Sequence, residues 1–303
     1  MLRGLVLLVV VVAALIAAFY LIIAILMIVK QDRWIYQPRR VRIDAQTPCH
    51  ASMPYKPVAL RTPDGVSIHG WFVNGPHPDC PVILFCHGNA GNIGNRITAV
   101  SQFVSIGFHC FIFDYRGFGN SSGKPSEDGL VLDARTAWHF LVENRRVPPS
   151  KIIIVGRSLG GGVATALAHQ LEMSDISTRL VLQCTFTSLT SVVRRMAGGF
   201  LRPWLYLLRH RYPSAERLRT MSCPVLVMHA VHDRVVPYPE GERLGQIVTM
   251  RNNLSSFVSF PNGGHNDCYI ECPTKYVQAL KEFAENTGCS PISQAPDWKR
   301  SSL

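Results

Sequence analysis

One serine between glycines, set between an apolar strand and a helix, constrains the fold of this chain more than any other feature. Residues 151–155 (KIIIV) are mostly β-branched and predict a short buried strand. The chain continues through Gly156-Arg157-Ser158-Leu159-Gly160 into residues 161–168, which predict a helix. A strand, a tight turn and a helix in this order expose the serine hydroxyl at a sheet edge, beside the N–H groups that begin the helix. A turn without chemistry is the alternative interpretation of this pentapeptide alone.

Two further polar residues follow predicted strands downstream of Ser158. Asp233 lies in the loop after the predicted strand 224–229, and His265 lies in the loop after the predicted strand 256–260. Open α/β sheets carry their ligand groups at the carboxyl ends of the strands, so we expect these side chains at one edge. A nucleophilic serine needs a base, and that base needs a group that orients it. The chain order serine, acid, histidine predicts Ser158 as nucleophile, Asp233 as the acid and His265 as the base.

A third feature predicts a site for an oxyanion. The apolar residues 82–86 predict a strand that ends in the turn His87-Gly88-Asn89. Acyl transfer through a tetrahedral oxyanion needs two fixed N–H donors. We expect one from the main chain of Leu159, directly after the serine, and the other from the main chain of Asn89.

Taken together, these motifs resemble the α/β-hydrolase family over residues 58–285. The motifs that carry the resemblance are residues 87–92 (HGNAGN), 114–121 (DYRGFGNS), 156–161 (GRSLGG), 233–237 (DRVVP) and 264–265 (GH). The combination is similar to a membrane-anchored subgroup of α/β-hydrolase-domain proteins, which includes protein depalmitoylases and members classed as serine peptidases. The resemblance implies the same roles for Ser158, Asp233 and His265. The palmitoyl-removing branch carries a cysteine-rich N-terminal segment, whereas this chain has only Cys49 in that region.

Predicted strands alternate with predicted helices over residues 57–286. This alternation predicts an α/β-hydrolase fold with a mostly parallel sheet and helices on both faces. An insert at residues 185–223 is expected to form a short helical lid, as this segment often does in the family. Residues 287–303 are polar and contain prolines, so we expect a disordered tail.

The N-terminal residues 5–29 contain no charged side chain and predict a transmembrane anchor. About 20 apolar residues are enough to cross a bilayer. A cleaved secretory signal has a shorter apolar region, about 7–15 residues long, followed by a cleavage site of small residues. The sequence after this run, Lys30-Gln31-Asp32-Arg33-Trp34, offers no such site. Residues 30–56 are therefore expected to link the anchor to the catalytic domain.

The charges beside the anchor favour a cytosolic catalytic domain. Only Arg3 and the α-amino group precede the span, whereas basic residues are frequent after it: Lys30, Arg33, Arg39, Arg40 and Arg42. Positively charged flanks tend to stay in the cytosol. Two glycosylation sequons, at Asn120 and Asn253, keep a lumenal orientation open.

The net charge of +11 does not indicate a nucleic-acid-binding protein, because no motif of that class is present. Basic residues beside a membrane span favour anionic lipid headgroups. The glycine-rich residues 117–126 do not match a P-loop, because Pro125 stands where a serine or threonine is required after the lysine. His229 and His232 lack the further ligands of a convincing metal site.

The sequence therefore predicts a membrane-anchored serine hydrolase that cleaves an acyl ester or thioester of a lipid or an acyl-protein. This chemistry needs no cofactor and no metal, and the expected partners are the lipid bilayer and an acyl-containing substrate. The insert is rich in arginine and aromatic residues, so we also weigh a lid that faces the membrane and admits acyl chains. A serine peptidase with the same triad is one alternative, and a non-catalytic membrane-tethered scaffold is another.

Overall fold

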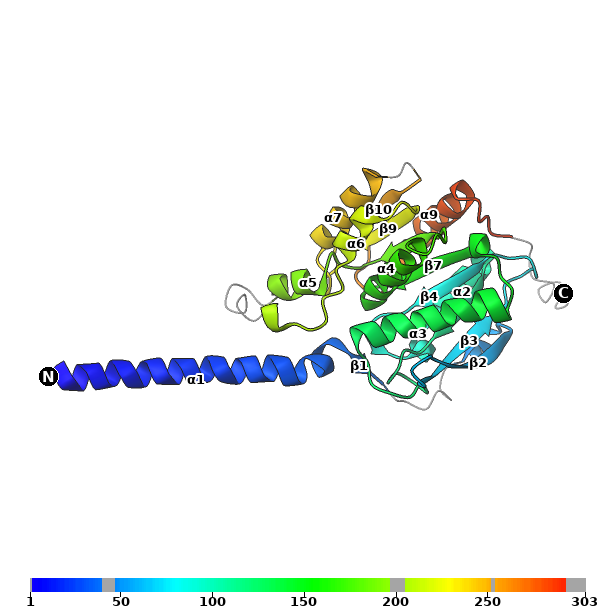
Figure 1. The fold of residues 1–303 in the computed structure, drawn as a ribbon. Coiled ribbons are helices and arrows are strands. Elements are labelled where there is room, and N and C mark those ends of the chain that lie inside the picture. Colours follow the sequence, from blue (N-terminus) through cyan, green and yellow to red (C-terminus); the bar gives the residue numbers. More distant parts are fainter. Residues whose placement is uncertain (1, 40–46, 197–204, 252–253, 293–303) are drawn as a thin grey trace.

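A mostly parallel sheet organises the chain (Figure 1). The computed structural model describes residues 2–39, 47–196, 205–251 and 254–292, and in them an eight-stranded sheet has the order β10-β9-β8-β7-β4-β6-β3-β2. Neighbouring strands from β10 through β6 are parallel, whereas β3 is antiparallel to both β6 and β2. The predicted α/β architecture is thereby confirmed. The strands are β2 (Tyr55–Arg61), β3 (Ser67–Val73), β4 (Val82–Cys86), β6 (His109–Phe113), β7 (Ile152–Arg157), β8 (Leu180–Gln183), β9 (Val225–Ala230) and β10 (Ser256–Phe260).

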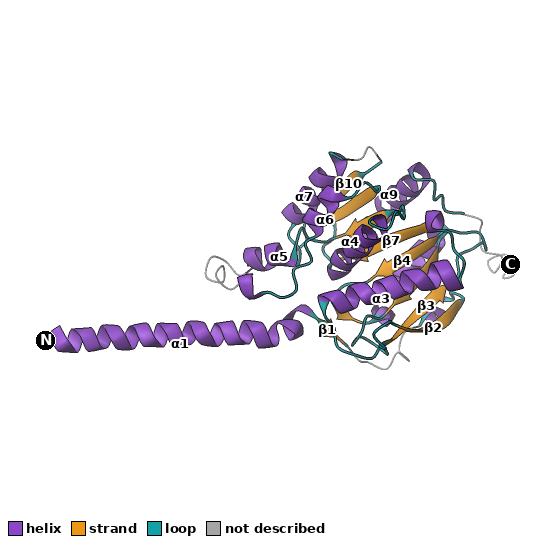
Figure 2. Ribbon diagram, viewed as in Figure 1, coloured by secondary structure: helices purple, strands orange, loops and turns teal. Residues whose placement is uncertain are grey.

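Helices cover both faces of the sheet (Figure 2). Along β4, Val82 and Leu84 belong to one buried cluster, and Ile83 and Phe85 belong to the other, because successive side chains of a strand point to opposite faces. A strand that is buried on both faces has apolar residues at successive positions, which explains the continuous apolar run at residues 82–86. The first cluster includes residues of α3 (Glu127–His139), α4 (Leu159–Glu172), α6 (Ser214–Thr220) and α7 (Tyr238–Thr249), and the second includes residues of α2 (Ile97–Ile106), α8 (Cys268–Glu271) and α9 (Pro273–Asn286).

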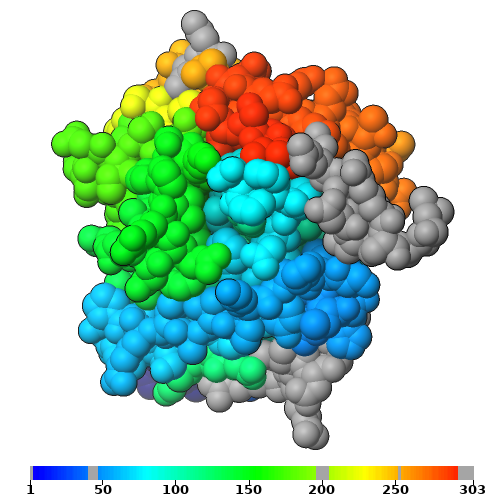
Figure 3. Space-filling view, turned by 90° about the vertical axis from the view of Figure 1, so that its right-hand side faces the viewer, coloured from blue at the N-terminus to red at the C-terminus, as the bar shows by residue number. Residues whose placement is uncertain are grey.

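The two edges of the sheet lie far apart on the surface. Seen from the side opposite α1, the orange to red segment that includes α9 and the blue β2–β3 hairpin occupy opposite ends of the molecule (Figure 3). This arrangement follows from the strand order, in which β10 and β2 are the edge strands. Short helical turns complete the connections: η2 (Pro48–Ala51), η3 (Ile93–Arg96), η5 (Pro149–Lys151), and a π-helical turn η4 (Phe140–Asn144) that extends α3.

The N-terminal helix α1 (Leu2–Ile35) extends away from the domain as one long rod (Figure 1). By length and composition it could cross a membrane, and the candidate span is Arg3–Ile35. Its last turns contact the insert at residues 185–223. Met27 packs with Leu205 and Leu208, and the Gln31 side chain accepts a hydrogen bond of 2.8 Å from the main-chain N–H of Arg209.

The predicted link at residues 30–56 needs correction, because its first part is helical and packed against the domain. The helix continues through residue 35, six residues beyond the apolar run at residues 5–29. Tyr36 is buried, and its hydroxyl lies 2.9 Å from the hydroxyl of Tyr212. Strand β1 (Gln37–Pro38) then pairs with β5 (Ala90–Gly91). Polar side chains end the apolar run without ending the helix, since they find partners on the insert. Residues 40–46 lie outside the described part.

The insert contains α5 (Leu189–Met196) and α6, and several of its arginines form ion pairs. Arg195 pairs with the buried Glu240 at 2.8 Å, and Arg209 pairs with Asp32 of α1 at 2.9 Å. These two arginines hold the insert to the domain and to α1. Residues 197–204 lie outside the described part of the insert.

The predicted disordered tail also needs correction at its start. Thr287 and Cys289 are buried, and the main-chain N–H of Ile292 donates to the carbonyl oxygen of Gly107 at 3.2 Å. Polar composition did not reveal these contacts, because they join the tail to a turn far away in the sequence. Residues 293–303 lie outside the described part of the chain.

Candidate active site

Ser158 occupies a strained turn between β7 and α4. Its φ of 54° and ψ of −122° lie in a region that residues with side chains rarely adopt. The Ser158 N–H donates to the carbonyl oxygen of Gln183 at 2.9 Å. A Cβ at Gly160 would overlap the carbonyl oxygen of Cys86, and a Cβ at Gly156 would overlap the carbonyl oxygen of Gly160. The two glycines are therefore required by the close approach of α4 to the ends of β4 and β7.

The structure brings together the three side chains that the sequence analysis selected. The Ser158 Oγ lies 3.0 Å from His265 Nε2, and His265 Nδ1 lies 2.7 Å from Asp233 Oδ2. An ionised carboxylate only accepts hydrogen bonds, so Nδ1 carries the proton and Nε2 is free to accept one from the serine hydroxyl. The three residues follow β7, β9 and β10, whose carboxyl ends meet at one edge of the sheet. The roles of Ser158 as nucleophile, His265 as base and Asp233 as acid remain predictions.

Asp233 is held as a charged group. Burial alone would raise its pKa, but the hydrogen bond from His265 and the main-chain N–H groups of Val235 and Val236 outweigh burial and keep the pKa below its usual value. Both N–H groups donate to Oδ1 at 2.8 Å, which leaves Oδ2 for His265. His229 is buried nearby and donates from Nε2 to the carbonyl oxygen of Val236 at 2.9 Å. Burial lowers the pKa of His229, so this residue is a neutral support of the loop.

The two expected oxyanion donors lie beside the serine. Leu159 is the first residue of α4, where helical N–H groups lack an intrahelical acceptor. The Asn89 N–H donates to no atom in the described part of the chain. The loop is close to the nucleophile, since a Cβ at Gly88 would lie 3.5 Å from the Cβ of Ser158. That Asn89 and Leu159 bind an oxyanion remains a prediction.

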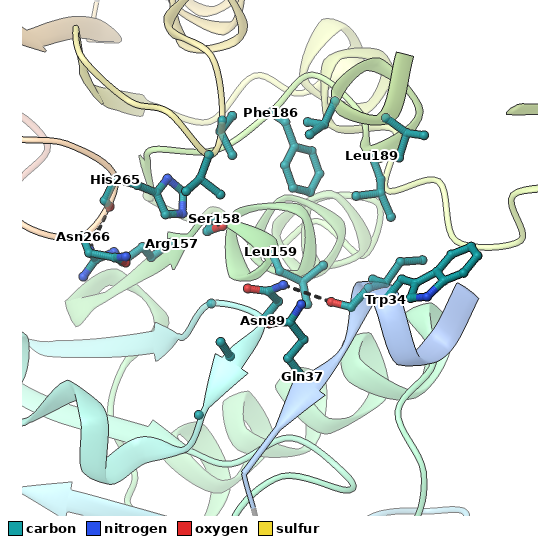
Figure 4. A pocket seen from close by; sticks show the side chains of 18 of the residues that line it. Trp34, Gln37, Asn89, Arg157, Ser158, Leu159, Phe186, Leu189, His265 and Asn266 are labelled. Atoms are coloured by element: carbon teal, nitrogen blue, oxygen red, sulfur yellow. Dashed lines mark hydrogen bonds between the residues drawn. The ribbon is translucent and has the colours of Figure 1, made fainter. Parts of the chain in front are cut away.

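The loop with Asn89 is tied to the end of the N-terminal helix. The Gln37 N–H donates to the Asn89 carbonyl oxygen at 2.9 Å, and the Asn89 side chain donates to the carbonyl oxygen of Ile35 at 3.1 Å (Figure 4). The segment that follows the candidate span thus takes part in holding the predicted oxyanion loop. The sequence carries no local signal of this contact.

A cavity of about 830 Å³ contains Ser158 and His265 in its wall (Figure 4). In Figure 4, Arg157 and Asn266 lie on one side of Ser158, and Leu189 and Trp34 lie on the other. Much of the apolar wall comes from α1 and the insert, through Met27, Trp34, Ile35, Phe186, Leu189, Val192, Val193 and Leu208, and Leu159, Val235, Val236 and Tyr269 add to it beside Ser158 and His265. A wall that is largely apolar, with a few convergent polar groups, is typical of a small-molecule or lipid site.

One cluster near the site has the residue types of a metal site. Ligand atoms of Cys184, Asp233 and His265 lie within 4.8 Å of one another. The hydrogen bond with Cys268 and burial raise the pKa of the Cys184 thiol well above its usual value. A thiol binds metal as the thiolate, and His265 Nδ1 is already engaged by Asp233. The donor chemistry therefore fits hydrogen bonding better than metal coordination.

Comparisons with known proteins agree with the fold. A sequence model of the α/β hydrolase fold matches residues 81–205. An uncharacterized protein of Mycobacterium tuberculosis is 34% identical over 264 residues, which cover 84% of this chain and 89% of that protein. The chain belongs to the α/β-hydrolase family.

Other α/β hydrolases extend the comparison. The lysophosphatidylserine lipase ABHD12 of Danio rerio is 35% identical over 234 residues, which cover 70% of this chain and 60% of that lipase. The solved structure of the Pyrococcus furiosus esterase Pf2001 has a TM-score of 0.67 and 19% identity, with 83% of this chain and 97% of that one covered. At this identity the esterase shows a common fold and no more.

The sequence analysis of this α/β hydrolase missed part of the cavity wall. The sequence did not predict that Trp34 and Arg157 line a cavity. Arg96 was not singled out at all, although both arginines line the cavity. Arg157 could have been noticed as a charge directly beside the serine, whereas nothing in the sequence signals Arg96.

Proposed function

We propose that this α/β hydrolase is a membrane-anchored serine hydrolase that cleaves an acyl ester or thioester of a lipid or an acyl-protein. The observation that carries the proposal is the continuous hydrogen-bond series from Ser158 to His265 to Asp233. In the proposed reaction Ser158 Oγ attacks the acyl carbonyl carbon, and its proton passes to His265 Nε2. The ester C–O or thioester C–S bond then breaks, and the leaving group takes that proton.

The second half of the reaction releases the acyl group. Water attacks the acyl carbonyl carbon and gives a proton to His265, the bond from that carbon to Ser158 Oγ breaks, and the carboxylic acid leaves as His265 returns the proton to the serine. Asp233 orients the imidazole and stabilises its charged form, while the N–H groups of Asn89 and Leu159 stabilise the oxyanion. Every step uses side chains and main-chain groups of the chain itself.

The apolar wall favours a lipid or acyl chain over a peptide as substrate. Met27, Trp34 and Ile35 of α1 line the cavity, so an acyl chain beside the anchor could reach Ser158 along an apolar surface. The name of the zebrafish relative, a lysophosphatidylserine lipase, supports a lipid ester. A peptidase would use the same three residues, and a panel of peptides beside lipid and acyl-protein esters distinguishes the two.

Labelling of the membrane fraction with a fluorophosphonate probe tests the proposal. We expect wild type to be labelled and Ser158→Ala to lose the label, because the probe reacts with an activated serine hydroxyl. Ser101→Ala, on the surface of α2, is the matched control and should be labelled like wild type. A folded wild type that takes no label would overturn the proposal and favour the scaffold alternative.

The contact between β1 and the Asn89 loop leads to a second prediction. Gln37→Pro removes the N–H that donates to the Asn89 carbonyl oxygen. Loss of one oxyanion donor typically costs about 10²–10³ in kcat, and a displaced donor should cost part of this, between about tenfold and 10²-fold. Gln37→Ala keeps the N–H and should retain most of the activity. Equal kcat values for the two variants would show that β1 does not position the loop.

The proposed topology places α1 across the membrane and the catalytic domain on the cytosolic side. The basic residues that follow the apolar run support this orientation. We expect protease added to sealed microsomes, whose cytosolic face is outward, to degrade the catalytic domain without detergent. A domain that is protected until detergent is added would reverse the orientation and agree with the lumenal alternative.

A further inference from the structure

Two arginines that line the cavity, Arg96 and Arg157, form no ion pair with a carboxylate in the described part of the chain. Arg157 is only 4% exposed, and its Nη2 donates to the carbonyl oxygen of His265 at 2.9 Å and to the Asn266 side chain at 3.4 Å. Its guanidinium carbon lies 4.9 Å from the centre of the Tyr269 ring. All of these partners are uncharged, so the positive charge of Arg157 remains unbalanced.

Arg96 reaches the same cavity from the end of η3. Its Nη2 donates to the carbonyl oxygen of Ala90, and its Nε is buried without a hydrogen-bond partner among the described residues. Burial, and after it the charge of Arg157, lower the pKa of Arg96 to about 10. The negative charge of Asp114 is a smaller influence that raises the pKa of Arg96, although the two side chains form no ion pair. Burial raises the pKa of Asp114 itself to about 7. Arg96 is therefore a partly buried cation whose Nε has no hydrogen-bond partner among the described residues, and it is held beside a second cation.

A buried arginine elsewhere in the fold has carboxylate partners, unlike Arg157. Arg116 lies between Asp64 and Asp133 at 2.7 and 2.8 Å, and Arg195 pairs with Glu240. Buried charges cost free energy unless they are paired. Two unpaired guanidinium groups in one cavity wall are stabilised when an anion binds between them, and Arg donors suit phosphate and carboxylate oxygens.

The place of the arginines within the cavity indicates which part of a substrate they contact. Arg157 lies on one side of Ser158, and the apolar residues Leu189 and Trp34 lie on the opposite side (Figure 4). An acyl chain against Leu189 and Trp34 would leave the alcohol portion of the ester facing Arg157, and Arg96 lies in the wall of the same cavity.

We infer that Arg96 and Arg157 form a subsite for an anionic group, a phosphate or carboxylate, on the leaving alcohol of the acyl ester. The inference rests on the proposed function and deepens it, since it names the substrate class as anionic single-chain acyl esters. The anionic group is bound and released unchanged. The bond that breaks is the ester C–O bond, and the proton of Ser158 passes through His265 to the departing alcohol.

Two esters with the same acyl chain test the subsite: a monoacylglycerol, and the same compound with a phosphate on the glycerol. We expect wild type to prefer the phosphorylated ester in kcat/KM. In Arg96→Gln the ratio of the two kcat/KM values should fall about 10–100-fold, the usual effect of losing a hydrogen bond to a charged group. Arg96→Lys keeps the charge and should retain most of the preference.

Control variants separate the subsite from general attraction to anionic micelles. Arg243→Gln removes an exposed charge on α7 and should leave the ratio unchanged. Inorganic phosphate distinguishes a free anion from a lipid headgroup. Phosphate that inhibits hydrolysis of the neutral ester more strongly in wild type than in Arg96→Gln would show that the subsite also binds free phosphate. Absence of inhibition would show that the subsite binds the phosphate only when an acyl chain is attached. In both cases the fall in ratio supports the subsite.

Failure of the inference is distinguishable from failure of the proposed function. Equal ratios in wild type and Arg96→Gln, with both esters hydrolysed, overturn the anionic subsite and leave the hydrolase intact. No hydrolysis of either ester and no fluorophosphonate labelling of folded wild type would overturn the proposed function, and the subsite with it.

Discussion

Ser158→Ala, His265→Ala and the double variant should all lower kcat for an acyl ester by about 10⁵–10⁶-fold. The three losses should be nearly equal, because a serine that cannot transfer its proton gains little from the remaining partner. The hydrogen bond of 3.0 Å between Ser158 Oγ and His265 Nε2 is the structural reason to expect this coupling. Steady-state kinetics in detergent, on one acyl ester at saturating concentration, measure these kcat values.

The control for these variants is Ser174→Ala, at an exposed serine after α4. It should have the kcat of wild type. Losses that multiply in the double variant would show that the two side chains act independently. That result would contradict a shared proton transfer and would count against the proposed reaction.

Asp233→Asn should lower kcat by about 10⁴-fold while the fold is retained. The side-chain amide can still accept the two N–H groups of Val235 and Val236 at Oδ1. The NH₂ group that replaces Oδ2 donates to His265 Nδ1 instead of accepting from it. His265 then carries its proton on Nε2 and can no longer accept the proton of Ser158.

Asp175→Asn provides the matched change at an exposed aspartate with a φ of 59°, a conformation that asparagine tolerates. It should retain the kcat and the melting temperature of wild type. A loss of less than tenfold in folded Asp233→Asn would show that Asp233 does not set the tautomer of His265.

The pH dependence follows from the charge on Asp233. Its pKa is lowered from the usual value of 3.8, so the carboxylate is ionised in the folded state at neutral pH. A lowered folded-state pKa contributes stability above the unfolded-state pKa, and this stability is lost as the pH falls through the folded-state value. The higher melting temperature expected of wild type relative to Asp233→Asn at neutral pH should therefore decline as the pH falls below about 4, and the difference should be lost below the folded-state pKa.

Local patterns made much of the fold predictable. Three local patterns predict the strand, turn and helix around the nucleophile: the β-branched run before Ser158, the glycines on both sides of it, and the apolar run after it. Each pattern spans only a few residues. The alternation of strands and helices gave the parallel sheet. Because parallel strands expose their carboxyl ends at one edge, the positions of Asp233 and His265 after their strands were enough to predict their approach to Ser158.

Contacts between distant segments were not predictable from the sequence. Residues 31–38 looked like a link, since hydropathy marks where an apolar run ends and not where a helix packs. The tail residues 287–292 looked disordered because their polar composition does not reveal a partner such as Gly107. The ion pair of Arg195 with Glu240 joins residues 45 positions apart, with no periodic pattern to indicate it.

By itself the sequence determined the kind of sheet, the strained serine turn, the order of the three polar residues and an apolar segment long enough to cross a membrane. Periodicity, glycine sterics and chain length control these features, and all three are local. Only the tertiary structure decided that the end of α1 forms a wall of the cavity, that Gln37 holds the Asn89 loop, and that Arg96 and Arg157 line the same cavity. Such features depend on which distant side chains the packed sheet brings within a few ångströms.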